Sequence, residues 1–218
     1  MKPKMHFVAL CLLLLAAMAC SLVTDLLPGE ETPLPEDVLF RDDFSDPSSG
    51  WDRVNGEEGI TDYQDGRYRI LVNTANTDVW ANPGLEFGDV IVEVNATKAG
   101  GPDDNDFGVI CRYQDLNNFY FFLISSDGYY GIGRVVAGEQ TLIGDNQLYP
   151  DDAIRQGEAT NHIRADCIGS SLTLHVNGVE LAEVQDDTLA SGDVGLLAGT
   201  FDQPGTDILF DDFVVRKP

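Results

Sequence analysis

The stretch NNFYFFLISSDGYYGIG, residues 117–133, decides the fold class of this chain because it places six aromatic rings in seventeen residues. Successive side chains of a β-strand point to opposite faces. Phe119 and Phe121 would therefore lie on one face of FYFFLI, and Tyr120 and Phe122 on the other. Rings on both faces predict a strand whose two sides are both covered. Either one side lies in a core between two sheets and the other lines a concave face, or the second side is buried under a loop.

Turn dipeptides separate this strand from its neighbours and recur along the chain. Asp127-Gly128 follows FYFFLIS, Asp65-Gly66 separates ITDY from RYRILV, and Asn177-Gly178 joins LTLHV to VELAEV. Such pairs form tight hairpins because both positions accept a positive φ. Other runs rich in Val, Ile, Phe and Tyr predict further short strands, and no segment has sustained helical periodicity. The pattern predicts an all-β fold of two packed antiparallel sheets, a β-sandwich.

Composition allows one sizeable domain and excludes some partners. The chain has 218 residues, of which 43% are hydrophobic, enough for a packed core. Its 13 basic and 37 acidic residues give a formal net charge of -24. Nucleic acid is an unfavourable partner, because its binding depends on cationic contacts to phosphate. The same charge argues against electrostatic attraction to anionic lipid.

The first twenty residues have the pattern of an export signal. Lys2 and Lys4 precede an apolar run over residues 7–19, which is as long as the apolar region of a secretory signal but too short to cross a bilayer comfortably. The run ends in AAMAC, which resembles the lipobox of bacterial lipoproteins, with Ala17 in place of the usual leucine. That resemblance implies cleavage before Cys20 and a lipid on its sulfur. The alternative is an ordinary cleaved signal peptide.

We therefore expect three segments. Residues 1–19 form a lipoprotein signal peptide, residues 20–38 a tether, and residues 39–218 a β-sandwich domain. The tether contains several prolines, which block regular structure, and acidic side chains that stay solvated and repel one another. This division predicts an extracytoplasmic protein at the cell surface, attached to the membrane through the lipid at Cys20.

Two of the four cysteines remain for a disulfide if Cys20 carries lipid. Cys11 leaves with the signal peptide, so Cys111 and Cys167 are left in an oxidising compartment. We expect them to form a disulfide; two buried free thiols are the alternative. No Cys-x-x-Cys or Cys/His spacing indicates a zinc or redox site.

Six motifs follow one another along the predicted domain: RDDFSDPSSGWD, DGRYRILV, DFGVICRYQDLNNFYFFLISSDGYYGI, NHIRADCIGSSLTLHVNGVELAEV, GDVGLLAG and ILFDDFVV. Their order resembles the concanavalin A-like, laminin G-like jelly roll, in the version found in bacterial exported lipoproteins of unassigned role. The resemblance implies a curved two-sheet sandwich. A central strand of such a sandwich shows one face to the core and the other to a concave trough.

A glycan site is expected on that trough. If Cys111 and Cys167 pair, residues at two-residue spacing from them face the core, and Arg112 points the other way. Guanidinium groups hydrogen-bond sugar hydroxyls, and aromatic rings stack on the apolar face of a pyranose. The alternatives are plain packing for each ring and a surface ion pair for Arg112. The candidate ligand-binding residues are Arg112, Tyr120 and Phe122, helped by Tyr129, Tyr130 or Trp80 from neighbouring segments.

A structural calcium ion is a further candidate. The first and last strands of such sandwiches often lie side by side, which would bring Asp43 near Asp211 and Asp212. Carboxylates that close repel one another. Either a calcium ion lies between them, since calcium prefers hard oxygen ligands, or they turn outward into water.

An enzyme is the less favoured class. Retaining glycosidases need two carboxyl groups about 5–5.5 Å apart, and concanavalin-like glucanases carry them on an E-x-D-x-x-E strand. The sequence contains no such string and no G-x-S-x-G. The acidic clusters at residues 103–106 and 151–152 lie in loop-like surroundings. We therefore expect a non-catalytic carbohydrate-binding module without catalytic residues. The alternatives are a protein-binding adhesion or scaffold domain and, after it, a glycan-active hydrolase.

Overall fold

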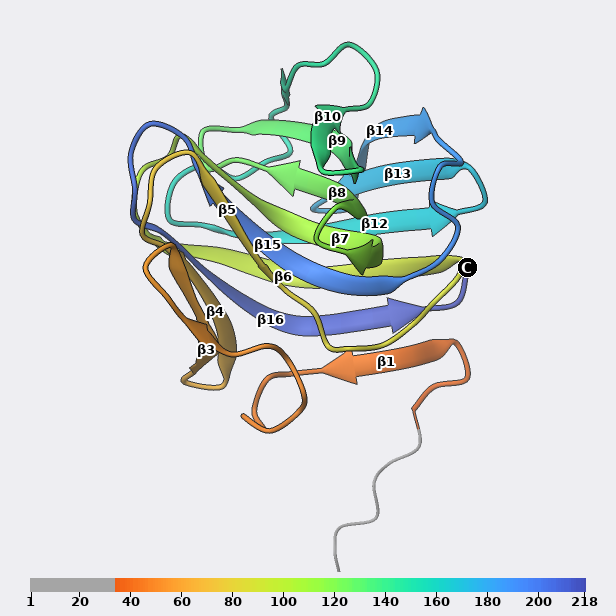
Figure 1. Cartoon of the computed structure of the whole chain (residues 1–218), viewed down its shortest axis with the longest axis horizontal. Coiled ribbons are helices and arrows are strands. Elements are labelled where there is room, and N and C mark those ends of the chain that lie inside the picture. Colours follow the sequence, from red (N-terminus) through yellow and green to blue (C-terminus); the bar gives the residue numbers. More distant parts are fainter. Residues whose placement is uncertain (1–33) are drawn as a thin grey trace, which may run out of the picture. The chain divides into compact units, whose positions relative to one another are not determined.

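β-branched and aromatic residues form sixteen strands and no helix in the part of the chain that the structure describes, residues 34–218 (Figure 1). The structure is a computed structural model, in which Glu36–Pro218 form one compact unit. Nothing helical between residues 34 and 218 has the length and hydropathy needed to cross a bilayer. The predicted signal peptide and the lipid site at Cys20 lie outside the described residues. The all-β prediction is confirmed.

One sheet contains nine strands, all paired in antiparallel fashion. Its order is β14-β13-β12-β6-β16-β4-β3-β2, and β1 also pairs with β16. The first and last strands of the domain are therefore neighbours, as predicted. The strands are β1 (Val38–Asp42), β2 (Val54–Asn55), β3 (Gly59–Gln64), β4 (Arg67–Val72), β6 (Val90–Gly100), β12 (Thr160–Ile168), β13 (Ser171–Val176), β14 (Val179–Gln185) and β16 (Thr206–Arg216).

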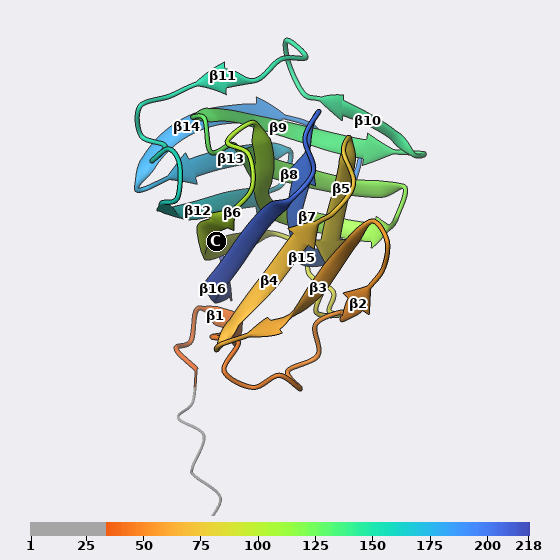
Figure 2. The ribbon, with the colours of Figure 1, turned by 90° about the vertical axis from the view of Figure 1, so that its left-hand side faces the viewer.

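The other sheet contains seven strands, also antiparallel. Its order is β10-β9-β8-β7-β15-β5, and β11 pairs with β9. The strands are β5 (Thr77–Ala81), β7 (Asn105–Asp115), β8 (Asn118–Ile124), β9 (Tyr129–Val136), β10 (Glu139–Leu142), β11 (Tyr149–Pro150) and β15 (Asp193–Thr200). Figures 1 and 2 show the strands of the two sheets as two layers. The predicted two-sheet antiparallel sandwich is confirmed.

Two of the three turn dipeptides form the predicted tight hairpins. Asp65 and Gly66 have φ values of +53° and +73° and connect β3 to β4, and Asn177 and Gly178, at +53° and +84°, connect β13 to β14. Two positive φ angles match the turn to the twist of the strands. Asp127-Gly128 belongs to a longer loop between β8 and β9, with Gly128 at +96°.

Alternate residues of the two sheets fill the space between them. Phe107 and Phe122 come from the seven-stranded sheet, and Tyr68 and Phe210 from the nine-stranded sheet, and all four side chains are buried. Burying apolar surface contributes about 25 cal/mol per Å². This layer is therefore the main source of stability.

Trp51 closes one end of the core. Its ring centre lies 4.9 Å from that of Phe213 and 5.3 Å from that of Phe44. The indole N–H donates a hydrogen bond to Asp42 Oδ2 at 2.9 Å, which satisfies the polar end of a side chain that is otherwise enclosed. The role of Trp51 is structural.

The outer face of the nine-stranded sheet carries charged side chains. Arg69 pairs with Asp207 at 2.7 Å through two hydrogen bonds, and Arg216 lies 2.9 Å from Glu93. The strands of this sheet alternate buried and partly exposed residues, as expected for a sheet with one side in water. A surface site with aromatic rings is therefore expected on the seven-stranded sheet.

A disulfide joins the two sheets. Cys111 on β7 is bonded to Cys167 on β12, and both residues are fully buried. The predicted disulfide is confirmed. It closes a loop with a sequence separation of 56 residues, so it restricts the unfolded chain substantially.

Breaking this disulfide is expected to destabilise the domain by about 2–4 kcal/mol, because the unfolded chain regains the entropy of a long loop. Urea unfolding of the oxidised and the reduced wild-type protein measures the difference without changing any side chain. The Cys111→Ala/Cys167→Ala variant should behave like the reduced protein. Equal unfolding midpoints in the oxidised and reduced states would contradict the prediction.

Candidate functional site

The register between β7 and β8 decides which rings face the core. Cys111 lies opposite Tyr120, so Tyr120 and Phe122 share the core face with the disulfide, and both are fully buried. The structure thus corrects the expectation that they line the trough. Phe119 and Phe121 lie on that outer side instead. The sequence shows the alternation along each strand but not the offset between neighbouring strands, and that offset selects the face.

A β-bulge turns Arg112 inward. Its φ is +52°, and the register of β7 against β8 shifts at this point, which breaks the two-residue alternation. The side chain is only 2% exposed. Its guanidinium donates hydrogen bonds to the carbonyl of Leu189 at 2.8 Å and to Asp89 at 3.0 Å, and its carbon lies 6.0 Å from the ring centre of Tyr120. Arg112 therefore holds the loop that precedes β15 by a hydrogen bond, and its side chain does not face the trough.

Tyr129 and Tyr130, which were expected to assist ligand binding, line two different hollows. Tyr129 is 39% exposed and lines a neighbouring hollow with Asp104 and Phe201. Tyr130 faces Tyr149, with ring centres 6.3 Å apart, beside a further hollow. The structure does not bring the six predicted ligand-binding residues together.

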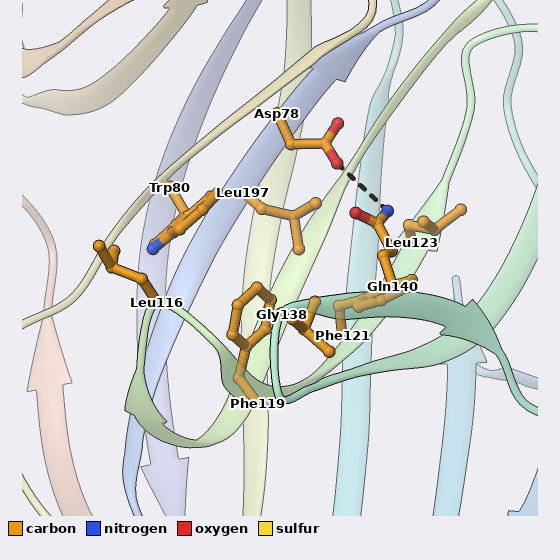
Figure 3. A pocket seen from close by; sticks show the side chains of 10 residues that line it. Asp78, Trp80, Leu116, Phe119, Phe121, Leu123, Gly138, Gln140 and Leu197 are labelled. Carbon is orange, nitrogen blue, oxygen red and sulfur yellow. Dashed lines mark hydrogen bonds between the residues drawn. The ribbon is translucent and has the colours of Figure 1, made fainter.

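A groove does lie on the side of the seven-stranded sheet that faces away from the core, and Trp80 lines it (Figure 3). The ring centres of Trp80 and Phe119 are 5.4 Å apart and their planes are inclined by 46°. The part of the groove beside these two rings has a volume of about 190 Å³. Its walls are formed by Asp78, Trp80, Leu116, Phe119, Phe121, Leu123, Val135, Gly138, Gln140 and Leu197.

The groove continues along the sheet past Phe121, Leu123 and Gln140 into a more open hollow of about 480 Å³. Asp106 and Leu148 are among the residues that line this second part. We call the two parts together the sheet groove. It combines mainly apolar walls with a few polar groups, the composition usual for small-molecule sites.

The rings beneath the sheet groove form a second, smaller core. Phe119 and Leu123 are each 5% exposed and Phe121 is 3% exposed. They pack with Leu197 and, at the edge, with the partly buried Trp80. Both alternatives for the aromatic strand are thus realised in part, because nearby segments cover some of this face and the remainder opens into the groove.

The sheet is rolled, so that its edge strands approach each other across the groove. β5 and β10 lie at opposite ends of the strand order, yet Gln140 Nε2 donates a hydrogen bond to Asp78 Oδ2 at 3.2 Å (Figure 3). Gly133 on β9 allows neighbouring strands of the rolled sheet to pack closely. A Cβ atom at that position would overlap the ring of Phe121 and lie 2.8 Å from the carbonyl oxygen of Thr141.

Two carboxyl groups face one another in the sheet groove. Asp78 on β5 and Asp106 on β7 both lie opposite Gly199 on β15, the strand between them. A Cβ atom at Gly199 would overlap Asp78 Oδ1 and lie 2.6 Å from Asp106 Oδ1. The glycine therefore leaves the space in which the two side chains meet. We call Asp78 and Asp106 the acid pair.

Burial disfavours charge on the acid pair. Asp106 is 5% exposed, and its Oδ1 has no hydrogen-bond partner in the described part of the chain. Burial raises the pKa of Asp106 well above its ordinary value of 3.8, and the neighbouring charge of Asp78 raises it further. Burial also raises the pKa of Asp78, against the effect of the hydrogen bond from Gln140. Two such close groups favour a state in which they hold one proton between them.

Sequence reasoning missed the acid pair. Asp106 was assigned to a loop with its acidic neighbours, whereas it is the second residue of β7. Asp78 stands alone in the sequence NTDVWAN. The available signal was the alternation in TDVWA and NDFGVIC, which puts Asp78 on the same face as Trp80, and Asp106 on the face opposite Cys111.

The structure does not support the candidate calcium site. Asp43 accepts hydrogen bonds from the backbone and hydroxyl of Ser45, and Asp212 accepts one from Asn95 at 3.2 Å. Within residues 34–218, no three acidic, histidine or cysteine side chains are grouped so that they could hold a metal ion. Asp211 accepts a hydrogen bond from the backbone N–H of Asp212 at 2.8 Å.

Comparison with known structures finds several similar β-sandwiches. The carbohydrate-binding module CBM66 from Bacillus subtilis superposes with a TM-score of 0.63 at 15% identity, covering 78% of this chain and 96% of that one. A Bacillus subtilis protein of unknown function with a galectin-like fold gives a TM-score of 0.61 at 13% identity, covering 84% and 97%.

Structures described as hydrolases are also similar. A putative glycosyl hydrolase from Parabacteroides distasonis has a TM-score of 0.55 at 17% identity, covering 81% of this chain and 98% of that one. No protein-family model matches the sequence, and no curated protein does. At these identities the similarity establishes the jelly-roll fold and leaves the activity to be argued from the site.

The acid pair predicts an unusual dependence of stability on pH. Because the pKa of Asp106 is raised in the folded state, its contribution to stability is complete below pH 3.8 and is lost as the pH rises through the raised value. The Asp106→Asn variant has no carboxyl group at this position, so it does not lose this stability as the pH rises. At pH 7.5 the variant should therefore be more stable than wild type.

Urea unfolding at pH 4 and pH 7.5 measures the effect, with the exposed Asp202→Asn as a control that removes the same charge. The stability gain of Asp106→Asn over wild type should shrink towards pH 4. An Asp106→Asn variant that is less stable than wild type at pH 7.5 would show that Asp106 is satisfied as a charged group.

Proposed function

We propose that this chain is a non-catalytic carbohydrate-binding module presented outside the cell. The sheet groove carries the proposal, because it sets the partly exposed ring of Trp80 beside polar groups on a rigid sheet. A sugar ring has an apolar face and a rim of hydroxyls. An aromatic ring can stack on that face, and nearby polar groups can form hydrogen bonds with the hydroxyls. The similarity of fold to a carbohydrate-binding module supports the proposal.

The parts of the sheet groove have separate tasks in this proposal. The face of a pyranose would lie against the partly exposed ring of Trp80, which packs on the buried ring of Phe119. Asp78 and Gln140, which are linked by a hydrogen bond across the groove, would receive the hydroxyls at the rim. Because these residues belong to sheet strands and not to free loops, the groove is largely preformed, which lowers the entropy cost of binding.

A protein-binding role is the second candidate, because the groove is lined mainly by apolar side chains such as Leu116, which is 65% exposed. A glycosidase role has less support. The carboxyl groups of a retaining enzyme lie about 5–5.5 Å apart on either side of the scissile bond. Asp78 and Asp106 crowd the same point above Gly199, which leaves no room for a sugar between them.

We also propose that the domain is tethered to a bacterial membrane through a lipid on Cys20. The motif AAMAC supports this proposal. The disulfide between Cys111 and Cys167 adds support for export, because disulfides persist in oxidising compartments outside the cytosol.

A glycan array probed with the Glu36–Pro218 unit, which contains both sheets and the disulfide, tests the binding proposal. We expect selective binding to a small group of glycans, and at least a tenfold loss of affinity for Trp80→Ala, which corresponds to about 1.4 kcal/mol. Tyr149→Ala is the matched control, because this exposed ring lies outside the sheet groove. An empty array, or equal losses for the two variants, would contradict the proposal.

The lipid proposal predicts that full-length wild type incorporates labelled palmitate in a bacterial host and sediments with membranes. Cys20→Ser should abolish labelling and move the protein to the soluble fraction, since the acyl chains supply the membrane affinity. Cys11→Ser, in the same apolar run, serves as the control and should still be labelled. Labelling that survives in Cys20→Ser would refute the assignment.

A further inference from the structure

The acid pair lacks a positive charge. Neither Asp78 nor Asp106 takes part in any of the ion pairs formed within residues 34–218. Gln140, the polar side chain bonded to Asp78, is neutral. Buried carboxylates are normally paired with a cation or bound to a metal. A partner from outside the chain would therefore be stabilised at this position.

The acid pair is also open to such a partner. Asp78 lines the deeper part of the sheet groove, and Asp106 lines the part that follows it. Asp106 Oδ1 is buried without any hydrogen bond in the described chain, and the glycine between the two strands lets the two carboxyl groups come together at one position. Figure 3 shows Asp78 and Gln140 at one end of the ring-lined part of the groove.

Three kinds of ligand could bind the acid pair: a metal ion, a neutral hydroxyl or an ammonium group. They differ in charge and in the number of bonds that they need. A calcium ion needs six to eight oxygen ligands, whereas this position offers two carboxylates and one amide. A neutral hydroxyl would satisfy Oδ1 of Asp106 but would bring no positive charge to the acid pair. A primary ammonium group supplies both a positive charge and three N–H donors, which matches the carboxylates of Asp78 and Asp106 and the amide oxygen of Gln140.

The rings of the sheet groove favour the same partner. Trp80 lines the groove with Asp78 and lies on the same face of β5, and the faces of aromatic rings attract ammonium groups, most strongly when water is excluded. The acidic balance of the whole chain, with a formal charge of -24, also draws cationic ligands towards the protein.

From this arrangement we infer that the sheet groove recognises a glycan with a free amine, an amino sugar that is not acetylated, and that the acid pair binds its ammonium group. The inference rests on the proposed carbohydrate-binding function and names the ligand class. The rings would hold the sugar, and Asp78 and Asp106 would select the amine over a hydroxyl or an acetamide.

Two oligosaccharides that differ only in acetylation test the inference. We would measure calorimetrically the affinity of the Glu36–Pro218 unit for a tetramer of glucosamine and for the tetramer of N-acetylglucosamine, at physiological ionic strength. The glucosamine tetramer should bind at least tenfold more tightly. Asp78→Asn and Asp106→Asn keep the shape of the side chains and should each reduce that preference by tenfold or more.

Controls separate specific recognition from general attraction to an acidic protein. Asp202→Asn removes one exposed negative charge from the segment after β15 and should keep the full preference. Trp80→Ala should weaken the binding of every glycan that wild type binds. Thermal unfolding of each variant confirms that it is folded, and Asp106→Asn is expected to be at least as stable as wild type at neutral pH.

Several outcomes would overturn the inference. Equal affinity for the two tetramers, no binding of either, or a preference that survives in Asp106→Asn would each refute it. So would a calcium-dependent rise in the unfolding temperature of wild type that is absent in Asp106→Asn, because the acid pair would then be a metal site. If neutral glycans still bind and Trp80→Ala abolishes that binding, the carbohydrate-binding function stands and only the amine specificity fails.

Discussion

The two sheets pack face to face through alternate side chains, and this alternation decides which residues remain available to a ligand. On β8 the packing takes Tyr120 and Phe122 into the core and leaves Phe119 and Phe121 on the other side. The disulfide between Cys111 and Cys167 holds the same two layers together. Any site on the sheet is therefore built from the complementary set of residues, the ones that the core does not use.

That complementary set has an unusual composition. Large rings alternate with glycines, so that the ring of Phe121 lies over Gly133, and the carboxyl groups of Asp78 and Asp106 meet over Gly199. Glycines make close approach possible without opening the backbone hydrogen bonds, since neighbouring strands remain paired in register on both sides of Gly199. The shape of the groove therefore depends on these glycines as well as on the side chains that line it.

Much of the fold could be predicted from the sequence because its signals are local. The Asp65-Gly66 and Asn177-Gly178 hairpins depend on residues adjacent in the chain, and the Cys111–Cys167 pairing followed from counting cysteines. The site depends on relations between distant strands. Gln140 meets Asp78 only because the sheet is rolled, and nothing in either segment indicates the roll.

Arg112 illustrates a different limit. Its position on a strand next to Cys111 predicts an outward side chain, and a single bulge with a positive φ reverses that direction. Bulges are frequent in curved sheets, but the residues around this one, CRYQD, contain no glycine to mark it. Predictions of facing residues therefore hold only up to the first bulge in a strand.

The position of the disulfide has a mechanical consequence. The chain enters the domain at β1, which is paired with β16 of the nine-stranded sheet, whereas the groove belongs to the seven-stranded sheet. A force applied between a captured ligand and the start of the domain must pass from one layer to the other. The sulfur–sulfur bond adds a direct covalent link between the layers to the backbone connections that cross between them, such as the one from β6 to β7, so part of the tension would pass through it.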